Sequence, residues 1–107
     1  MASGRLGTPA DMSATTLTTI YTVPAGTFAV ASINVLNRSA SAVTVRLALA
    51  ATDTPTAAEY IEYDISIPAK AVLERTGLVL TATQKIVAYT GATDVSVMAY
   101  GIETTTA

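Results

Sequence analysis

Acidic side chains gather in the middle of the chain, and their spacing is the most direct pointer to chemistry. Glu59, Glu62 and Asp64 lie close together, and Asp53 lies a short distance upstream. Paired carboxylates are what glycoside hydrolysis requires, and several oxygen ligands are what Ca²⁺ prefers. However, Glu62 and Asp64 fall on the predicted solvent side of a strand, and the Asp-rich loop with a central Gly that binds Ca²⁺ is missing. We interpret the carboxylates as a hydrated acidic edge, and expect neither catalytic residues nor a metal site.

Histidine and cysteine are both absent from the 107 residues. The lack of histidine removes the commonest general base, the Ser-His-Asp triad and most zinc sites. The lack of cysteine removes disulfides and thiolate metal sites. Gly-rich phosphate-binding motifs do not occur either. We therefore expect a protein that is not an enzyme and that holds no cofactor.

Five tyrosines are the remaining candidates for a ligand site, because the chain has no tryptophan. Tyr63 has the inward phase of its strand and is expected in the core, with its hydroxyl at the rim. Tyr60 and Tyr89 are the better contact candidates. They support one alternative interpretation, a carbohydrate-binding module that attaches to a host glycan.

The composition predicts an unusually neutral surface. Only 13% of the residues are charged, whereas about 25% is usual for globular domains. A net charge of −2 without a basic cluster argues against nucleic acid and anionic membrane as partners. The opening residues lack the apolar segment of a secretory signal. The uncharged run over 12–37 is too polar for a membrane span and is broken by Pro and Gly at 24–26.

Apolar residues alternate with polar ones at short intervals, which predicts strands. The clearest strand covers 42–50, with every second residue from Val43 to Leu49 expected inward. Over 60–67 the inward set is Ile61, Tyr63, Ile65 and Ile67, and over 94–102 it is Val95, Val97 and Ala99. Weaker patterns predict strands over 17–23, 27–36, 71–76, 77–80 and 85–90.

The connections between these strands carry turn residues. Pro24 and Gly26 suit a β-turn that closes a hairpin. The apolar parity of 27–36 shifts halfway, which indicates a bulge near Ala31-Ser32 or a strand buried on both faces. Thr54 and Pro55 predict at most one short helical turn before residue 60.

About eight short antiparallel strands predict an all-β fold, a two-sheet sandwich with either jelly-roll or immunoglobulin-like topology. Periodicity does not choose between the two. The sandwich domain is expected over 17–103. Residues 1–16 are expected to form an N-terminal arm, and residues 104–107 a C-terminal tail.

A neutral, Thr-rich surface favours contacts between copies of the protein, although exposed Thr is also simply a good strand former. In the first interpretation, the N-terminal arm orders against a neighbouring subunit, and Arg38 or Arg75 forms an ion pair across the boundary. The expected interface residues are Arg5, Leu6, Met12, Leu17, Tyr60, Tyr89, Met98 and Tyr100.

Most of the chain resembles a family of small β-sandwich virion proteins of tailed bacteriophages. The pattern of that family is an LYTVPAG-type turn, a strand leading into Asn, a strand of alternating aliphatics, a Y-I-x-Y-D segment and a Gly-bearing final strand. In this chain these parts are IYTVPAG ending at residue 26, and residues 33–37, 43–49, 60–64 and 100–103.

The resemblance implies a structural protein of the virion that contacts copies of itself and other virion proteins, such as the major capsid protein or tail proteins. It brings no catalytic residues. Decoration of the capsid as a cement protein is the first expectation, because the chain shows neither the additional domain nor the coiled coil of longer fibre proteins. A place in the tail, baseplate or fibre is the alternative.

Overall fold

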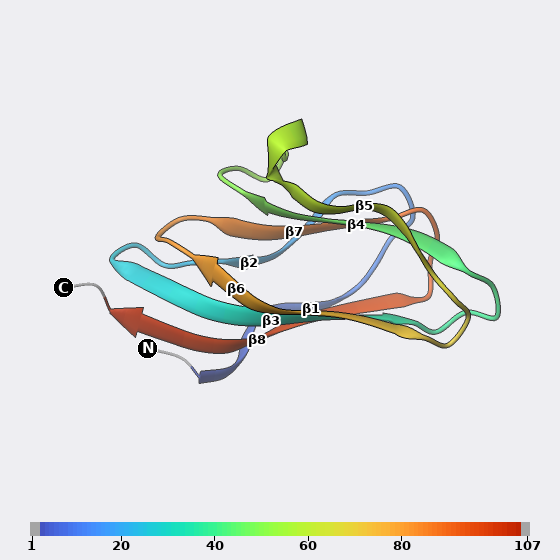
Figure 1. Ribbon diagram of the computed structural model, residues 1–107, viewed down its shortest axis with the longest axis horizontal. Coiled ribbons are helices and arrows are strands. Elements are labelled where there is room, and N and C mark those ends of the chain that lie inside the picture. Colours follow the sequence, from blue (N-terminus) through green and yellow to red (C-terminus); the bar gives the residue numbers. More distant parts are fainter. Residues whose placement is uncertain (1–2, 106–107) are drawn as a thin grey trace.

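The computed structural model describes residues 3–105 of the 107-residue chain. These residues form eight strands and one short 3-10 helix: β1 (Ser3–Asp11), β2 (Thr18–Thr22), β3 (Thr27–Asn37), β4 (Val43–Ala50), η1 (Ala57–Glu59), β5 (Tyr60–Ile67), β6 (Val72–Leu80), β7 (Lys85–Thr90) and β8 (Val95–Thr105). The strands make two antiparallel four-stranded sheets that pack face to face (Figure 1). The predicted all-β two-sheet sandwich is therefore confirmed.

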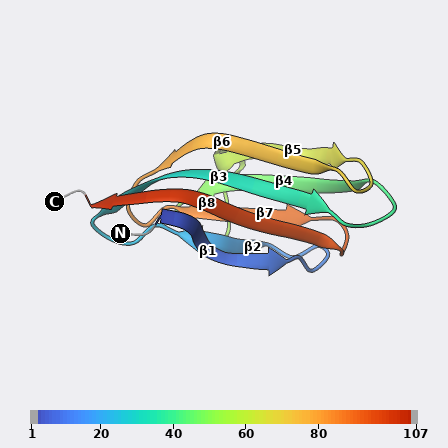
Figure 2. The same cartoon turned by 90° about the horizontal axis from the view of Figure 1, so that it is seen from below.

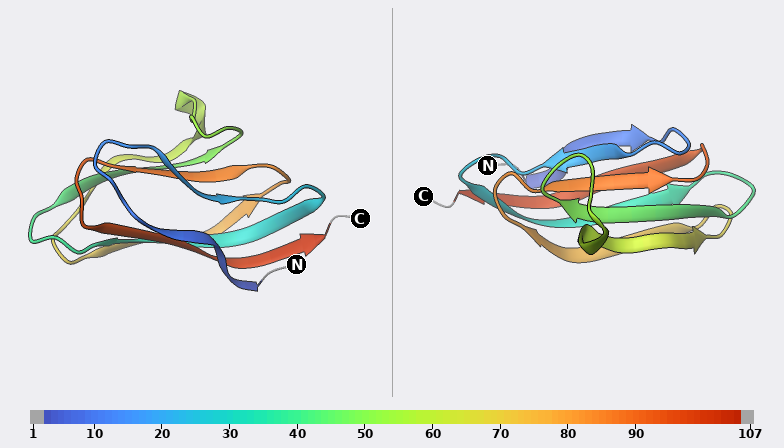
Figure 3. Two further views of the ribbon diagram at one scale, coloured as in Figure 1. Left: turned by 180° about the vertical axis from the view of Figure 1, so that it is seen from behind. Right: turned by 90° about the horizontal axis from the view of Figure 1, so that it is seen from above.

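The order of the strands identifies the topology. Sheet I has the order β1-β8-β3-β6, and sheet II has the order β2-β7-β4-β5 (Figure 2; Figure 3). The pairs β1–β8, β2–β7, β3–β6 and β4–β5 are all antiparallel, which is the pairing of one long hairpin folded over on itself. Eight strands arranged in this way form a jelly roll, so the structure selects the jelly roll over the immunoglobulin-like alternative.

The inward residues of the two sheets fill the core between them. The residues predicted inward on β4 and β8 that are fully or almost fully buried are Val43, Val45, Leu47, Val95, Val97 and Ala99. Burying an aliphatic side chain of this size contributes about 1.5–3 kcal/mol. The alternation on β4 and β8 therefore predicted the core correctly.

The connection between β4 and β5 folds over the outer face of sheet II (Figure 1). Ala48 and Val87 pair across β4 and β7 and are buried, but they are not part of the central core. Ala48 therefore points outward as predicted, yet it is fully buried. The predicted helical turn is present here as η1, where Glu59 accepts a hydrogen bond from the backbone N–H of Thr56. No helix within residues 3–105 is long and apolar enough to cross a membrane.

Strand β3 keeps one phase along its length, which corrects the predicted change of parity. Every second residue from Ala29 to Val35 is buried, and the pairing with β8 continues without interruption. The bulge lies on β6 instead, where the register with β3 shifts opposite Ser32. Gly77 adopts the positive φ of +70° that suits a bulge. Residues 71–76 and 77–80 consequently belong to a single strand.

Strand β5 changes phase at Asp64, so the predicted inward position of Tyr63 is wrong. The register with β4 shifts between Ile65 and Glu62, and Asp64 has a φ of +53°. One extra residue in a strand reverses the faces of the residues beyond it, here as far as a second shift of register between Glu62 and Tyr60. Tyr63 is consequently 60% exposed and Ile61 is exposed as well, whereas Glu62 lies toward the inner side.

Residues 3–11 form β1 at the edge of sheet I, so the separate arm expected over 1–16 is wrong. Leu6 on β1 and Met12 just beyond it are buried in the core. The register with β8 shifts between Leu6 and Ala10. Gly7 and Pro9 lie in this interval and interrupt the alternation of apolar and polar residues, so the sequence does not predict the strand. At the other end, residues 104–105 of the expected tail belong to β8, and the remainder lies outside the described residues.

Residues 24–26 carry the chain from one sheet to the other. β2 lies in sheet II and β3 lies in sheet I, so the turn between them does not close a hairpin as predicted. Val23 pairs instead with the β6–β7 connection, through backbone hydrogen bonds to Gln84 and from Thr83. The turn itself is present, but it spans the edge of the sandwich.

The buried side chain of Asn37 joins two connections at one end of the sandwich. Its amide nitrogen lies 2.8–3.1 Å from the carbonyl oxygens of Ser41, Ile67 and Pro68, and its oxygen accepts hydrogen bonds from Ser39. Asn37 is 0% exposed. The Asn at the end of this strand, which is part of the sequence pattern, thus joins these two connections through its side chain.

Replacing Asn37 with alanine is expected to lower the free energy of unfolding by about 3 kcal/mol, because buried carbonyl groups lose their donor. Urea denaturation of purified protein measures the change. Asn34→Ala on the same strand, where the side chain points outward, should cost about 0.5 kcal/mol. Equal stability of the two variants would show that the Asn37 contacts contribute nothing.

Candidate functional site

The acidic residues that first suggested chemistry each have a different partner. Glu62 pairs with Arg75, joining edge strand β5 to edge strand β6 across the sandwich. Glu59 accepts hydrogen bonds from the backbone N–H groups of Thr56 and Ala51, which lower the pKa of its carboxyl group. Within the described residues no three acidic side chains converge as a metal site. Glu59 and Glu62 therefore each have a partner within the chain.

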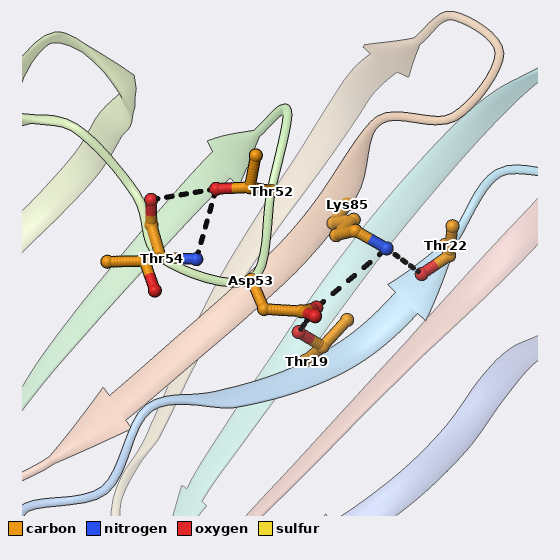
Figure 4. Close-up of polar contacts among 6 residues, drawn as sticks. All are labelled: Thr19, Thr22, Thr52, Asp53, Thr54 and Lys85. Carbon is orange, nitrogen blue, oxygen red and sulfur yellow. Dashed lines mark hydrogen bonds and ion pairs between the residues drawn. The ribbon is translucent and has the colours of Figure 1, made fainter.

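Asp53 fastens the long connection to the outer face of sheet II (Figure 4). Its Oδ1 accepts a hydrogen bond from the Thr19 hydroxyl at 2.5 Å and lies 3.8 Å from Lys85 Nζ. Lys85 also donates to Thr22 Oγ1 at 3.1 Å. Because Thr19 and Thr22 lie on β2 and Lys85 on β7, this cluster ties the 52–54 loop to two strands. The polar atoms of this cluster make the hydrogen bonds and the ion pair of that attachment.

Three tyrosines and an arginine form a second cluster on the same face. The Arg46 guanidinium carbon lies 4.2 Å from the ring centre of Tyr63 and 4.7 Å from that of Tyr89. Tyr60 meets Tyr63 edge to face, with ring centres 5.1 Å apart. Asp64 accepts two hydrogen bonds from Arg46, at 2.6 and 3.2 Å. This bond raises the pKa of Arg46 and lowers that of Asp64, so the pair is ionised at neutral pH.

The tyrosine cluster brings together the two residues proposed for sugar contact, Tyr60 and Tyr89, and adds Tyr63. However, the Arg46 guanidinium covers one face of the Tyr63 ring and one face of the Tyr89 ring. Such cation–π contacts are worth about 0.5–1 kcal/mol at exposed sites. The cluster therefore stacks on itself, and those two ring faces are not free for a sugar.

The outer face of sheet I, which is turned toward the viewer in Figure 2, carries several exposed apolar side chains. We define it by six outward side chains on β3, β6 and β8: Val30, Glu74, Val79, Met98, Tyr100 and Ile102. Val79 is 62% exposed, Ile102 51% and Met98 39%. Val79, Val30 and Ile102 are direct neighbours across the three strands. A row of exposed aliphatic residues on a sheet is typical of a contact surface.

Glu74 is the acidic member of this face and has a fixed position. The Tyr100 hydroxyl donates to Glu74 Oε2 at 2.6 Å, so the tyrosine side chain reaches from β8 across β3 to β6. This hydrogen bond raises the pKa of Tyr100. Arg5 projects from β1 on the opposite margin, directly beside Tyr100 in the register.

The predicted interface residues separate into three groups. Leu6 and Met12 are only 1% and 3% exposed within the chain's own core, so their assignment to an interface is wrong. Their apolar character serves β1 and the core. Arg38 and Arg75 both pair within the chain, with Asp11 and Glu62, and so do not need the predicted neighbouring subunit for these ion pairs.

The remaining predicted residues are accessible but do not form one surface. Arg5, Met98 and Tyr100 lie on or beside the outer face of sheet I. Tyr60 and Tyr89 belong to the tyrosine cluster on sheet II, and Leu17 lies just before β2. The structure thus divides the predicted interface between two opposite faces.

Sequence reasoning missed Val30 and Val79 as surface residues, and did not place Glu74 beside them on one face. The available signal was that residues 77–80 and the last strand are apolar on both faces. Apolar residues on the outer face of a sheet indicate that another apolar surface covers that face. Without the register, nothing in the sequence places Val79 beside Val30 and Ile102.

No pocket is found among the described residues. The exposed aliphatic row of Val30, Val79 and Ile102 lies on the outer face of sheet I, whereas Ile61 and Leu17 are exposed on or next to strands of sheet II. Comparison with family models, with curated proteins and with solved structures found no match.

Proposed function

We propose that this protein is a non-enzymatic structural component of a bacteriophage particle that decorates and stabilises the head through contacts between subunits. Its partners are copies of itself and the major capsid protein. The proposal places the protein in the virion. It assigns the contact to the outer face of sheet I.

The observation that carries this proposal is the exposed aliphatic row of Val79, Val30 and Ile102. Burying apolar area yields about 25 cal/mol for each Å² removed from water, so a protein that covers this row with a neighbour gains stability. The low charge of the whole chain also favours contact with a neighbour, because few charged side chains lose their hydration when such a surface is covered.

The jelly-roll topology also supports a place in a virus particle, since this fold occurs in viral capsid domains. It occurs in lectin domains as well, and a fold does not by itself fix a function. The sequence resemblance to phage virion proteins and the apolar outer face favour the particle over the lectin. The tyrosine cluster also favours the particle over the lectin, because Arg46 covers one ring face each of Tyr63 and Tyr89 and leaves those faces unavailable to a sugar.

The copy number of this chain in purified particles tests the proposal. Quantitative mass spectrometry against the major capsid protein should give a stoichiometry in the hundreds per particle by analogy with shell-covering assemblies. A small multiple of three or six would move the protein to the tail, baseplate or fibre. Particles that contain none of the chain would refute a structural role.

A further inference from the structure

We propose that the outer face of sheet I binds the same face of a second copy of this chain, around a two-fold axis that runs parallel to the strands between β8 and β3. The inference rests on the proposed function, because it specifies the contact between subunits. A two-fold contact uses one self-complementary patch on both partners. Aligned packing of two sheets about 10 Å apart is the ordinary geometry for such faces.

Two members of the aliphatic row, Ile102 and Val30, meet across this axis, whereas Val79 on β6 lies over β1 of the second copy. The strand order β1-β8-β3-β6 places the midline of the sheet between β8 and β3. Rotation about that midline puts β8 of one copy over β3 of the other. Because Ile102 and Val30 are register partners, Ile102 then lies over Val30 of the second copy, and the reverse contact forms on the other side of the axis.

The charges at the two margins become complementary in the same arrangement. The rotation places β1 over β6, and so brings Arg5 to the strand that carries Glu74 in the second copy. In the register, Arg5 shares a row with Tyr100, whereas Glu74 shares the next outward row with Met98 through β3. The two rows are two residues apart, or about 7 Å along the strand, and facing sheets lie about 10 Å apart, so the Arg5 and Glu74 side chains bridge these offsets together.

Both charged groups are available for this contact. In the described part of the chain, Arg38, Arg46 and Arg75 each pair with a carboxylate, whereas Arg5 has no ion-pair partner. Glu74 is held by the Tyr100 hydroxyl and has no cationic partner among the same residues. A carboxylate already fixed in position loses less conformational entropy on pairing.

The charges also select the direction of the axis. A two-fold axis across the strands would stack β1 on β1 and β6 on β6, so Arg5 of one copy would face the strand that carries Arg5, and not Glu74, in the other copy. Like charges brought together across an interface cost free energy, whereas complementary ones fix the orientation. The axis parallel to the strands is the one that forms two Arg5–Glu74 pairs.

Sedimentation equilibrium of four variants tests this arrangement: Arg5→Glu, Glu74→Arg, the double variant R5E/E74R, and Lys70→Glu as the control. Each single variant at the interface should raise the dimer dissociation constant by about tenfold or more at low salt. The double variant should return to within about threefold of the wild type, because the pair is restored with reversed signs. Lys70→Glu makes the same charge change as Arg5→Glu in a turn outside the face, and should leave the constant unchanged.

The outcomes separate this inference from the proposed function. If the wild type associates but neither single variant weakens it, or the double variant is not restored, the two-fold arrangement is wrong while self-association stands. If the wild type remains a monomer at all concentrations, a second copy does not occupy this face, and the arrangement falls. The copy number in particles then still decides the proposed function independently.

Discussion

Replacing Val45 with aspartate is expected to leave the protein unfolded at 25 °C. Val45 is 0% exposed and lies in the centre of β4, between the two sheets. An aspartate there buries a carboxyl group without a partner, which belongs to the class of substitutions that cost more than about 4 kcal/mol. A small domain has only about 5–15 kcal/mol of stability in total. Circular dichroism and a urea titration measure the loss.

The matched control is Thr44→Asp, one residue earlier on the same strand. Thr44 points outward and is exposed, so the same new charge stays hydrated and should change the free energy of unfolding by about 1 kcal/mol or less. A folded Val45→Asp protein of wild-type stability would overturn the inward phase of β4, and with it the register of sheet II.

Replacing Gly101 with alanine is the second substitution with a large expected effect, on the order of 4 kcal/mol. Gly101 lies on β8 with a φ of +150°, where a side chain is strained. A Cβ atom there would lie 2.1 Å from the Val30 carbonyl oxygen and 2.9 Å from Ala31 Cα. Both contacts are with the backbone of β3, which cannot move aside without breaking the central pair of sheet I.

Gly26→Ala separates the two causes. Gly26 also has a positive φ, of +69°, but a Cβ atom there meets nothing within 4 Å. It should therefore cost only the backbone strain, about 1 kcal/mol. Thermal unfolding of both variants gives the comparison. If Gly101→Ala cost no more than Gly26→Ala, β8 and β3 would not approach as closely as described.

The fold class was predictable because half-buried strands alternate strictly. The predicted strand over 85–90 coincides with β7, and those over 42–50 and 60–67 match β4 and β5 closely. β1 was missed because Gly7 and Pro9 interrupt its alternation at a shift of register. Alternation reports which residues share a face, but it fails where the backbone inserts an extra residue.

Bulges account for the wrong inward assignments. The extra residue at Asp64 turned Tyr63 outward, and the extra residue near Gly77 lies on β6, although the parity of 27–36 had placed it on β3. A bulge is a property of two paired strands, and the partner of a strand is unknown at the level of sequence. The topology could not be predicted either, because the sequence does not show which strands pair, and β1 pairs with β8 from the far end of the chain.

The candidate surface was predictable only in part. Met98 and Tyr100 were recognised because the last strand is apolar on both faces. The aliphatic row needs β6, β3 and β8 in their observed order, and the Arg5–Glu74 complementarity needs both margins of the sheet. Leu6 and Met12 were assigned to an interface because β1 was expected outside the domain, whereas it completes the core.

The most direct test of self-association through the outer face of sheet I is sedimentation equilibrium of Val30→Lys beside Leu17→Lys. Both side chains are 37% exposed in the wild type, but only Val30 belongs to the outer face of sheet I. We expect the wild type and Leu17→Lys to form dimers, and Val30→Lys to remain a folded monomer at the same concentration. A Val30→Lys protein that associates as strongly as the wild type, or a wild type that never associates, would contradict self-association through this face.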